Sequence, residues 1–174
     1  MKRIANILGT PISEDIVFWL WPGKHTERQH LFNQLKREIS GLKGLSLRDR
    51  DNQDFNTVTQ RLVDKSNKGC DKDGLAARTW RYRYIETYLL SSSAIARAAK
   101  VEEKFVIEDA RAFGIDLSAF TTTEILPGLQ DFSSKSLLTE GKDCLVVKYK
   151  ISKYDVVDNM FSSEIHQDFK EIIS

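Results

Sequence analysis

The stretch from residue 16 to residue 52 constrains the fold more than any other part of the chain. Residues 16–21 are an uncharged run of six apolar side chains, a pattern typical of a strand buried on both faces of a parallel sheet. Residues 26–40 begin with a helix start signal and continue with apolar residues at helical spacing, which predicts a helix. Residues 42–47 predict a second strand, so the order strand, helix, strand indicates a right-handed parallel crossover.

The rest of the chain extends this α/β pattern. A third strand is expected at 75–82 after an exposed loop at 66–74, and helices are expected at 2–8, 53–66, 85–100, 102–114, 154–160 and 165–173. Residues 142–150 fit a strand or a helix equally well. We therefore predict a small parallel sheet flanked by helices, with residues 1–100 as the α/β core and residues 101–174 as a mainly helical part of the same domain.

The net charge of +1 hides a difference between the two parts of the chain. Residues 1–100 carry 18 Lys and Arg against 11 Asp and Glu, a net +7, whereas residues 101–174 carry 8 against 14, a net −6. A basic first part could bind phosphates and leave the acidic second part for packing or partner contacts. An uneven spread of charges over solvated faces would give the same totals.

The sequence also bears on the compartment. No apolar run approaches the roughly 20 residues that span a bilayer, and the first residues lack the apolar stretch of a signal peptide. Cys70 and Cys144 have no neighbouring cysteine, and two thiols are too few to hold a secreted fold together, so both are expected to be free. A cytoplasmic protein without a membrane segment is the resulting expectation.

Two carboxylates follow the second predicted strand. Asp49 and Asp51 are two residues apart, so in extended chain they would point to the same side, beyond the carboxyl ends of the strands where sites form in open parallel sheets. Paired carboxylates with basic neighbours suit a Mg²⁺ ion that keeps several waters and shares phosphate oxygens. The alternative is an ordinary exposed loop, since this short pattern is common.

A second block lies where the third strand should turn into a helix. Arg81, Arg83 and Glu86 are concentrated there among four aromatic side chains that are expected to belong mainly to the core. Glu86 could be a third acid near the metal or could cap the helix. Together with Arg50, the two arginines are expected to contact nucleic-acid phosphates, although Arg83 could equally pair with Glu86.

The order of these blocks resembles the topoisomerase–primase (Toprim) domain fused to ABC-type ATPases, as in the overcoming-lysogenization-defect nucleases and related phage-defence ATPases. The resemblance spans nearly the whole chain and rests on residues 48–51, 83–90, 141–143, 152–156 and 165–172. It implies Mg²⁺- or Mn²⁺-dependent cleavage of DNA, with Asp49 and Asp51 as metal ligands. It further implies that Glu86 belongs to the catalytic acids, that Lys142 stabilises phosphate charge, and that an ATPase domain is a partner.

One departure from that pattern is important. A Toprim domain opens with a strand that ends in a catalytic glutamate, and this sequence begins within what would be the following helix; a GxxxxGK[ST] phosphate loop is also missing. The expectation is therefore a carboxyl-terminal portion that is weak or inactive as a nuclease. It should self-associate at the sheet edge beside residues 16–21 or have that edge covered by a foreign segment. The alternatives are a non-catalytic module that binds nucleic acid or protein, and a nucleotide-sugar transferase.

Overall fold

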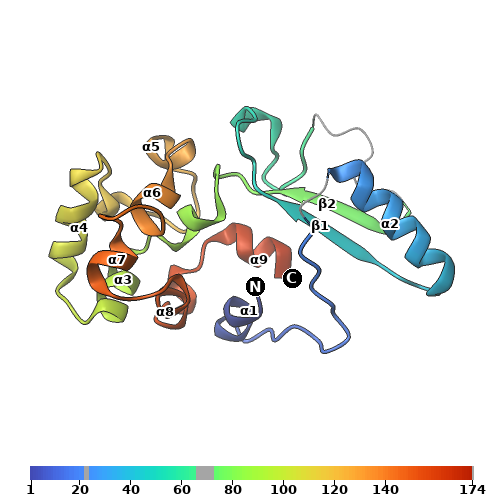
Figure 1. The fold of residues 1–174 in the computed structure, drawn as a ribbon, viewed down its shortest axis with the longest axis horizontal. Coiled ribbons are helices and arrows are strands. Elements are labelled where there is room, and N and C mark those ends of the chain that lie inside the picture. Colours follow the sequence, from blue (N-terminus) through green and yellow to red (C-terminus); the bar gives the residue numbers. More distant parts are fainter. Residues whose placement is uncertain (22–23, 66–72, 174) are drawn as a thin grey trace.

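The computed structural model describes residues 1–21, 24–65 and 73–173. A small sheet and one long helix form one side of the molecule, and a group of short helices forms the other (Figure 1). Helices α1 and α9 lie between these two parts (Figure 1). The helices are α1 (Lys2–Ile7), α2 (His25–Glu38), α3 (Ser92–Ala99), α4 (Glu103–Ala112), α5 (Pro127–Gln130), α6 (Ser134–Leu138), α7 (Leu145–Tyr149), α8 (Lys153–Asp158) and α9 (Gln167–Ile173). Short 3₁₀ turns are η1 (Phe55–Thr57), η2 (Ile85–Leu89), η3 (Leu117–Ala119) and η4 (Ser162–Glu164).

The predicted small parallel sheet is confirmed, and in the described part of the chain it consists of β1 (Gly44–Arg48) and β2 (Leu75–Thr79). The two strands pair in parallel from Gly44 opposite Leu75 to Arg48 opposite Thr79. Helix α2 packs on β1 so closely that a Cβ atom on Gly44 would lie 2.9 Å from the ring of Phe32. A side chain at position 44 would therefore push α2 away from the sheet.

The predicted first strand at 16–21 is wrong. These residues form no strand, and every one of their side chains is exposed. The parallel neighbours are instead β1 and β2, so α2 does not connect two strands of the described sheet. An apolar run identifies a segment that would gain from burial, but it does not identify the surface that buries it.

The predicted helix at 53–66 is also wrong. The segment contains η1 and then an isolated antiparallel bridge between Val58 and Asp64. Asp54 accepts a hydrogen bond from the backbone N–H of Asn56, and the Thr59 hydroxyl accepts one from the N–H of Val63. Such local bonds from side chain to backbone compete with helical hydrogen bonds and favour turns.

The helices after β2 follow the prediction more closely. The expected helix at 85–100 divides into η2 and α3, and α3 begins where the Ser91 hydroxyl accepts the N–H of Ala94. The ambiguous stretch 142–150 is helical, as α7. Helices α4, α8 and α9 lie within or beside the ranges predicted for them, and most of the predicted loop at 66–74 lies outside the described residues.

The core lies among the short helices and extends to the end of β2. Trp80, Tyr82 and Tyr88 are buried there, as expected for most aromatic side chains of this block. Phe169 of α9 packs against Trp80 with ring centroids 4.9 Å apart, which joins the carboxyl-terminal helix to the strand. Cys144 is buried with a free thiol, while Cys70 lies outside the described residues. No helix in the described ranges has the length and apolar character needed to cross a membrane.

Candidate functional site

Asp49 lies directly after β1 and is joined to the segment that follows β2. Its Oδ1 accepts a hydrogen bond from the backbone N–H of Ile85, the first residue of η2, at 3.1 Å. Because parallel strands end at the same edge of a sheet, the exits of β1 and β2 are neighbours. This bond therefore places Asp49 beside the turn that carries Glu86.

Glu86 is a buried acid, and one of its carboxylate oxygens accepts no hydrogen bond from the described residues. The residue is 6% exposed, and its Oε2 has no hydrogen-bond partner among the described residues. Its Oε1 lies 3.6 Å from Nζ of Lys153. A buried carboxylate oxygen without a donor is costly, so this atom marks a position that a donor or a cation would stabilise.

The negative charge of Glu86 affects the pKa of Asp49. The pKa of Asp49 is raised to about 6, mainly by burial and next by the nearby charge of Glu86. The N–H of Ile85 and the charge of Lys135 lower the pKa in part, and Asp51 makes the smallest contribution, which raises it. Burial and a neighbouring like charge are the two general causes of a raised carboxyl pKa.

The raised pKa predicts how stability depends on pH. Asp49 binds its proton more tightly in the folded chain than in the unfolded chain, where its pKa has the ordinary value of 3.8. Its contribution to stability is thus greatest at low pH and is lost as the pH rises from about 4 to about 6. Compared with Asp49→Asn, which keeps the acceptor for Ile85, the wild type should lose about 1–2 kcal/mol of unfolding free energy across this interval.

Urea unfolding of both proteins at pH 4.5 and 7.5 in a metal-free buffer measures this difference. The exposed Asp158 provides the matched control, because Asp158→Asn should leave the wild-type dependence on pH unchanged. If the unfolding free energies of the wild type and of Asp49→Asn changed equally with pH, the pKa of Asp49 would be the same in the folded and the unfolded chain.

Two lysines that were not among the predicted site residues flank these acids. Lys135 belongs to α6 and Lys153 to α8, and both helices pack against η2. Nζ of Lys135 also lies 4.7 Å from the ring centre of Tyr84. Lys153 falls within the 152–156 block of the resemblance, so the sequence could have indicated it. No sequence pattern pointed to Lys135.

Asp51 does not have the extended backbone that the prediction of a face shared with Asp49 assumed. Strand β1 ends at Arg48, and Asp51 has a left-handed backbone with φ of 52°. Its N–H donates to the carbonyl of Arg83, and its side chain is exposed. The argument from extended spacing fails because the chain is already turning after Asp49.

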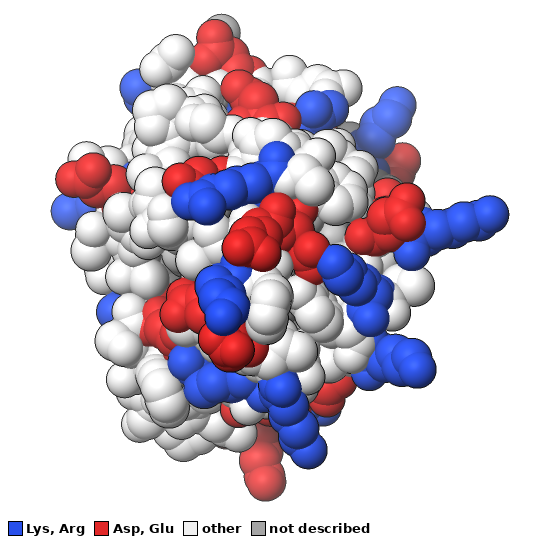
Figure 2. All heavy atoms as spheres, turned by 90° about the vertical axis from the view of Figure 1, so that its left-hand side faces the viewer, with Lys and Arg blue, Asp and Glu red and all other residues white. Residues whose placement is uncertain are grey.

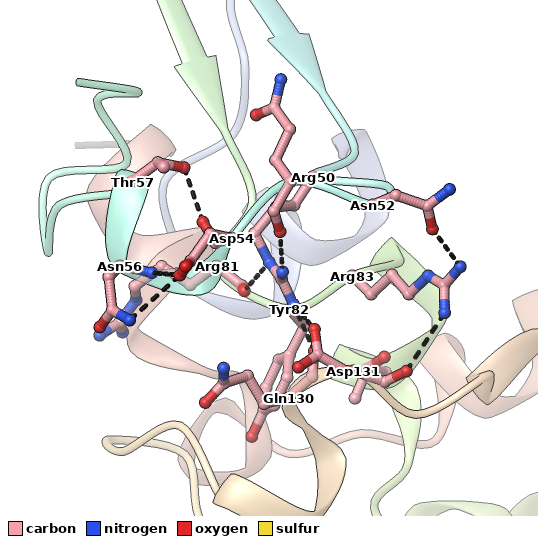
Figure 3. Close-up of polar contacts among 12 residues, drawn as sticks. Arg50, Asn52, Asp54, Asn56, Thr57, Arg81, Tyr82, Arg83, Gln130 and Asp131 are labelled. Carbon is pink, nitrogen blue, oxygen red and sulfur yellow. Dashed lines mark hydrogen bonds and ion pairs between the residues drawn. The ribbon is translucent and has the colours of Figure 1, made fainter. Parts of the chain in front are cut away.

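Arg50 is buried, and its guanidinium bonds to groups inside the protein (Figure 3). Its guanidinium donates to the carbonyls of Arg81, Gln53 and Gln130 and pairs with Oδ1 of Asp131 at 2.6 Å. Four of its five N–H donors are thus bound within the protein, and the side chain is 1% exposed. Its place indicates a structural role in holding the turn after β1, in contrast to the predicted contact with nucleic acid.

Arg81 is also committed to an internal ion pair. Its guanidinium binds both carboxylate oxygens of Asp168, which is 1% exposed and lies in α9. The hydroxyl of Tyr88 donates to the same carboxylate at 2.6 Å, and the ring of His166 lies 3.5 Å from it. Arg81 therefore connects the end of β2 to α9 and does not face solvent as a phosphate-binding residue would.

Arg83 is the predicted arginine that remains near the surface. Its guanidinium donates to Oδ1 of Asn52 and to the carbonyl of Asp131, while its Nε is buried without a partner in the described structure (Figure 3). It lines a hollow of about 480 Å³ that also contains the carboxylates of Asp51 and Asp54. It does not pair with Glu86, the alternative that the sequence left open.

Lys142 lies apart from the acids. It is exposed and lines a different hollow, together with Asp109 and Lys148. The lysine charges that act beside Asp49 and Glu86 are those of Lys135 and Lys153. The side of the molecule on which the short helices lie carries acidic and basic side chains interspersed, with no continuous basic area (Figure 2).

The site thus consists of two neighbouring acids, Asp49 and Glu86, with a lysine on each of two adjoining helices. Within residues 1–21, 24–65 and 73–173, no three His, Cys, Asp or Glu side chains come together as a group that could hold a metal ion by themselves. Comparisons with protein-family models, curated proteins and solved structures gave no significant match. The Toprim resemblance therefore remains a prediction, and the function is argued from the acids and their surroundings.

Proposed function

We propose that this domain cleaves phosphodiester bonds in DNA with the help of Mg²⁺ or Mn²⁺, and that Asp49 and Glu86 hold the ion. The observation that carries the proposal is the buried Oε2 of Glu86, which has no hydrogen-bond partner in the described structure, beside a second carboxylate. The Toprim resemblance supports the choice of DNA as substrate and of an ATPase domain as partner.

The residues present fit such an ion. Mg²⁺ is usually bound through one or two carboxylates and completes its coordination with waters and substrate phosphates, so a third acid is not required. A divalent cation between Asp49 and Glu86 would offset the repulsion that raises the pKa of Asp49. When bound, the ion would act as a Lewis acid on a phosphate oxygen and would generate a nucleophilic hydroxide from water.

The chain's own cations suit the remaining charge of the substrate. Lys135 and Lys153 each lie beside one of the acids, so both are placed to attract a phosphate held at the ion. Arg83, which donates to Asn52 in the turn after β1 and lies 5.2 Å from the ring centre of Tyr84, would position the neighbouring phosphate. Lys142 is not part of this proposal because it lies at a different hollow.

A non-catalytic Toprim-like module is the second candidate. It is favoured by the position of Asp51, whose left-handed backbone and exposed side chain leave Asp49 and Glu86 as a pair. Such a module would keep a metal or DNA contact without turnover, because catalysis also requires acids that orient the attacking group.

Metal binding is the first test of the proposed function. At ten times its dissociation constant an ion stabilises the folded chain by about 1.4 kcal/mol, which raises Tm by roughly 3–5 °C for a chain of this size. We expect this rise for the wild type in millimolar Mn²⁺ at pH 7.5, and no rise for Asp49→Asn or Glu86→Gln. Asp158→Asn, which removes an exposed charge elsewhere, should respond as the wild type does.

Cleavage of supercoiled plasmid in the same buffer then separates the two candidates. Turnover by the wild type that is lost in Asp49→Asn and Glu86→Gln would support the nuclease, whereas a shift in Tm without turnover would support the non-catalytic module. If Mn²⁺ moved the Tm of all four proteins equally, or of none, the acids would not be a metal site and the proposal would fail.

A further inference from the structure

The most conspicuous feature that the proposed site does not use is the apolar segment 16–21. Val17 is 84% exposed, Trp19 59% and Leu20 97%. The other three side chains, Ile16, Phe18 and Trp21, are between 38% and 50% exposed. In Figure 1 the segment belongs to the connection that loops away from α1 before it reaches α2. A contiguous exposed apolar run of this kind is typical of an interaction surface.

The backbone of the segment is as open as its side chains. The N–H of Ile16 bonds to the carbonyl of Ser13, but from residue 17 to residue 21 no backbone hydrogen bond occurs in the described structure. Two side-chain contacts of the segment are Trp19 against Trp21, with ring centroids 5.9 Å apart, and Nζ of Lys2 in α1, which lies 5.6 Å from the ring centre of Phe18. Since β-branched and aromatic residues favour strands, the segment has both the composition and the free donors and acceptors of an unpaired strand.

The size of the surface matches one half of a protein interface. With roughly 150–250 Å² for each side chain, the exposed fractions of the six residues amount to on the order of 700 Å². A standard interface takes about 800 Å² from each partner. The segment is therefore large enough to support a stable dimer if a second copy supplies the same surface.

We propose that residues 16–21 of two copies of this chain pair as antiparallel strands around a two-fold axis. The segment contains no charge, so two copies meet without repulsion, and a two-fold interface requires that one patch be complementary to itself. Antiparallel pairing centred on Trp19 places Phe18 opposite Leu20 of the other copy. The same register places Val17 opposite Trp21. Such cross-strand pairs stabilise a sheet, and the pairing satisfies the free backbone groups.

Sedimentation equilibrium of the full chain over a range of concentrations tests the dimer. The wild type should approach twice its mass of 20.0 kDa as its concentration rises. Leu20→Lys and Val17→Lys should each weaken the association by at least tenfold, because each places a charge inside the paired surface. Both side chains are exposed in the single chain, so neither change removes a core contact. Val147→Lys, at an exposed apolar position on α7, is the matched control and should associate like the wild type.

Amide hydrogen exchange supplies the readout that is specific to strand pairing. In the dimer alternate amides within residues 17–21 should exchange at least tenfold more slowly than in Leu20→Lys at the same concentration. A wild type that stays monomeric at all concentrations overturns the proposal, including the case in which it binds phospholipid vesicles through the tryptophans instead. A dimer that persists in both lysine variants, or that leaves these amides unprotected, overturns it as well.

Discussion

Replacing Asp168 by alanine is expected to reduce the free energy of unfolding by about 3–5 kcal/mol. The carboxylate is buried and accepts from the Arg81 guanidinium and the Tyr88 hydroxyl. Its removal would leave a largely buried guanidinium without a counter-charge and a buried phenol without an acceptor. Breaking one partner of a buried pair costs far more than the pair contributes, because the remaining group must stay desolvated.

Chemical denaturation at pH 7.5 measures this change, and Asp158→Ala is the matched control. Asp158 also pairs with an arginine, Arg3, but both side chains are about half exposed. Exposed pairs contribute about 0–1 kcal/mol, so the control should fall within that range. Equal losses in the two variants would mean that the buried site admits water and that Arg81 is not dependent on Asp168.

Acid should also destabilise the wild type through Asp168. Burial opposes ionisation of Asp168, but the adjacent ring of His166 and the hydrogen bonds from Arg81 and Tyr88 outweigh it and hold the pKa of this carboxyl below its ordinary value. A lowered pKa contributes stability that is fully present above the ordinary value of 3.8 and that is lost as the pH falls through the folded value. The two carboxyls therefore act in different pH intervals: stability from Asp49 rises as the pH falls from about 6 to about 4, whereas stability from Asp168 is lost only below 3.8.

The sequence could predict those parts of the fold that depend on local patterns. Helix α2 and both strands follow from apolar spacing within a few residues, and all three occur where they were expected. The segments 16–21 and 53–66 failed for different reasons. The first needs a partner surface that no local pattern describes, and in the second the bonds of Asp54 and Thr59 to nearby backbone compete with the helix.

The candidate site also combines a part that could be predicted from the sequence with a part that could not. That Asp49 and Glu86 approach each other could be predicted, because they follow the ends of two parallel strands and such ends meet at one edge. The roles of Arg50 and Arg81 could not be predicted, since their counter-charges lie 81 and 87 residues away in the chain. A basic residue beside an acidic motif has the same appearance in the sequence whether it faces a ligand or the interior.

Arg50→Ala is the second change with a large expected effect, about 3–5 kcal/mol of unfolding free energy, because several carbonyls lose a buried donor. The Arg50 side chain is 1% exposed, and its loss would leave three backbone carbonyls and the carboxylate of Asp131 without their donor. Because these bonds join the turn after β1 to the segments at Arg81 and Gln130, the turn that carries Asp49 should also loosen. Arg50→Ala should thus weaken the response of Tm to Mn²⁺ as well as the fold itself.

Two further variants separate the hydrogen bonds of Arg50 from its packing. Arg50→Met keeps most of the apolar stem but removes the donors, so a loss close to that of Arg50→Ala would assign the effect to the unsatisfied carbonyls. The exposed Arg61 provides the control, and Arg61→Ala should change the unfolding free energy by less than about 0.5 kcal/mol. If Arg50→Met unfolded with the wild-type free energy, water would be replacing the guanidinium. The turn that positions Asp49 would then depend on its own backbone bonds and not on Arg50.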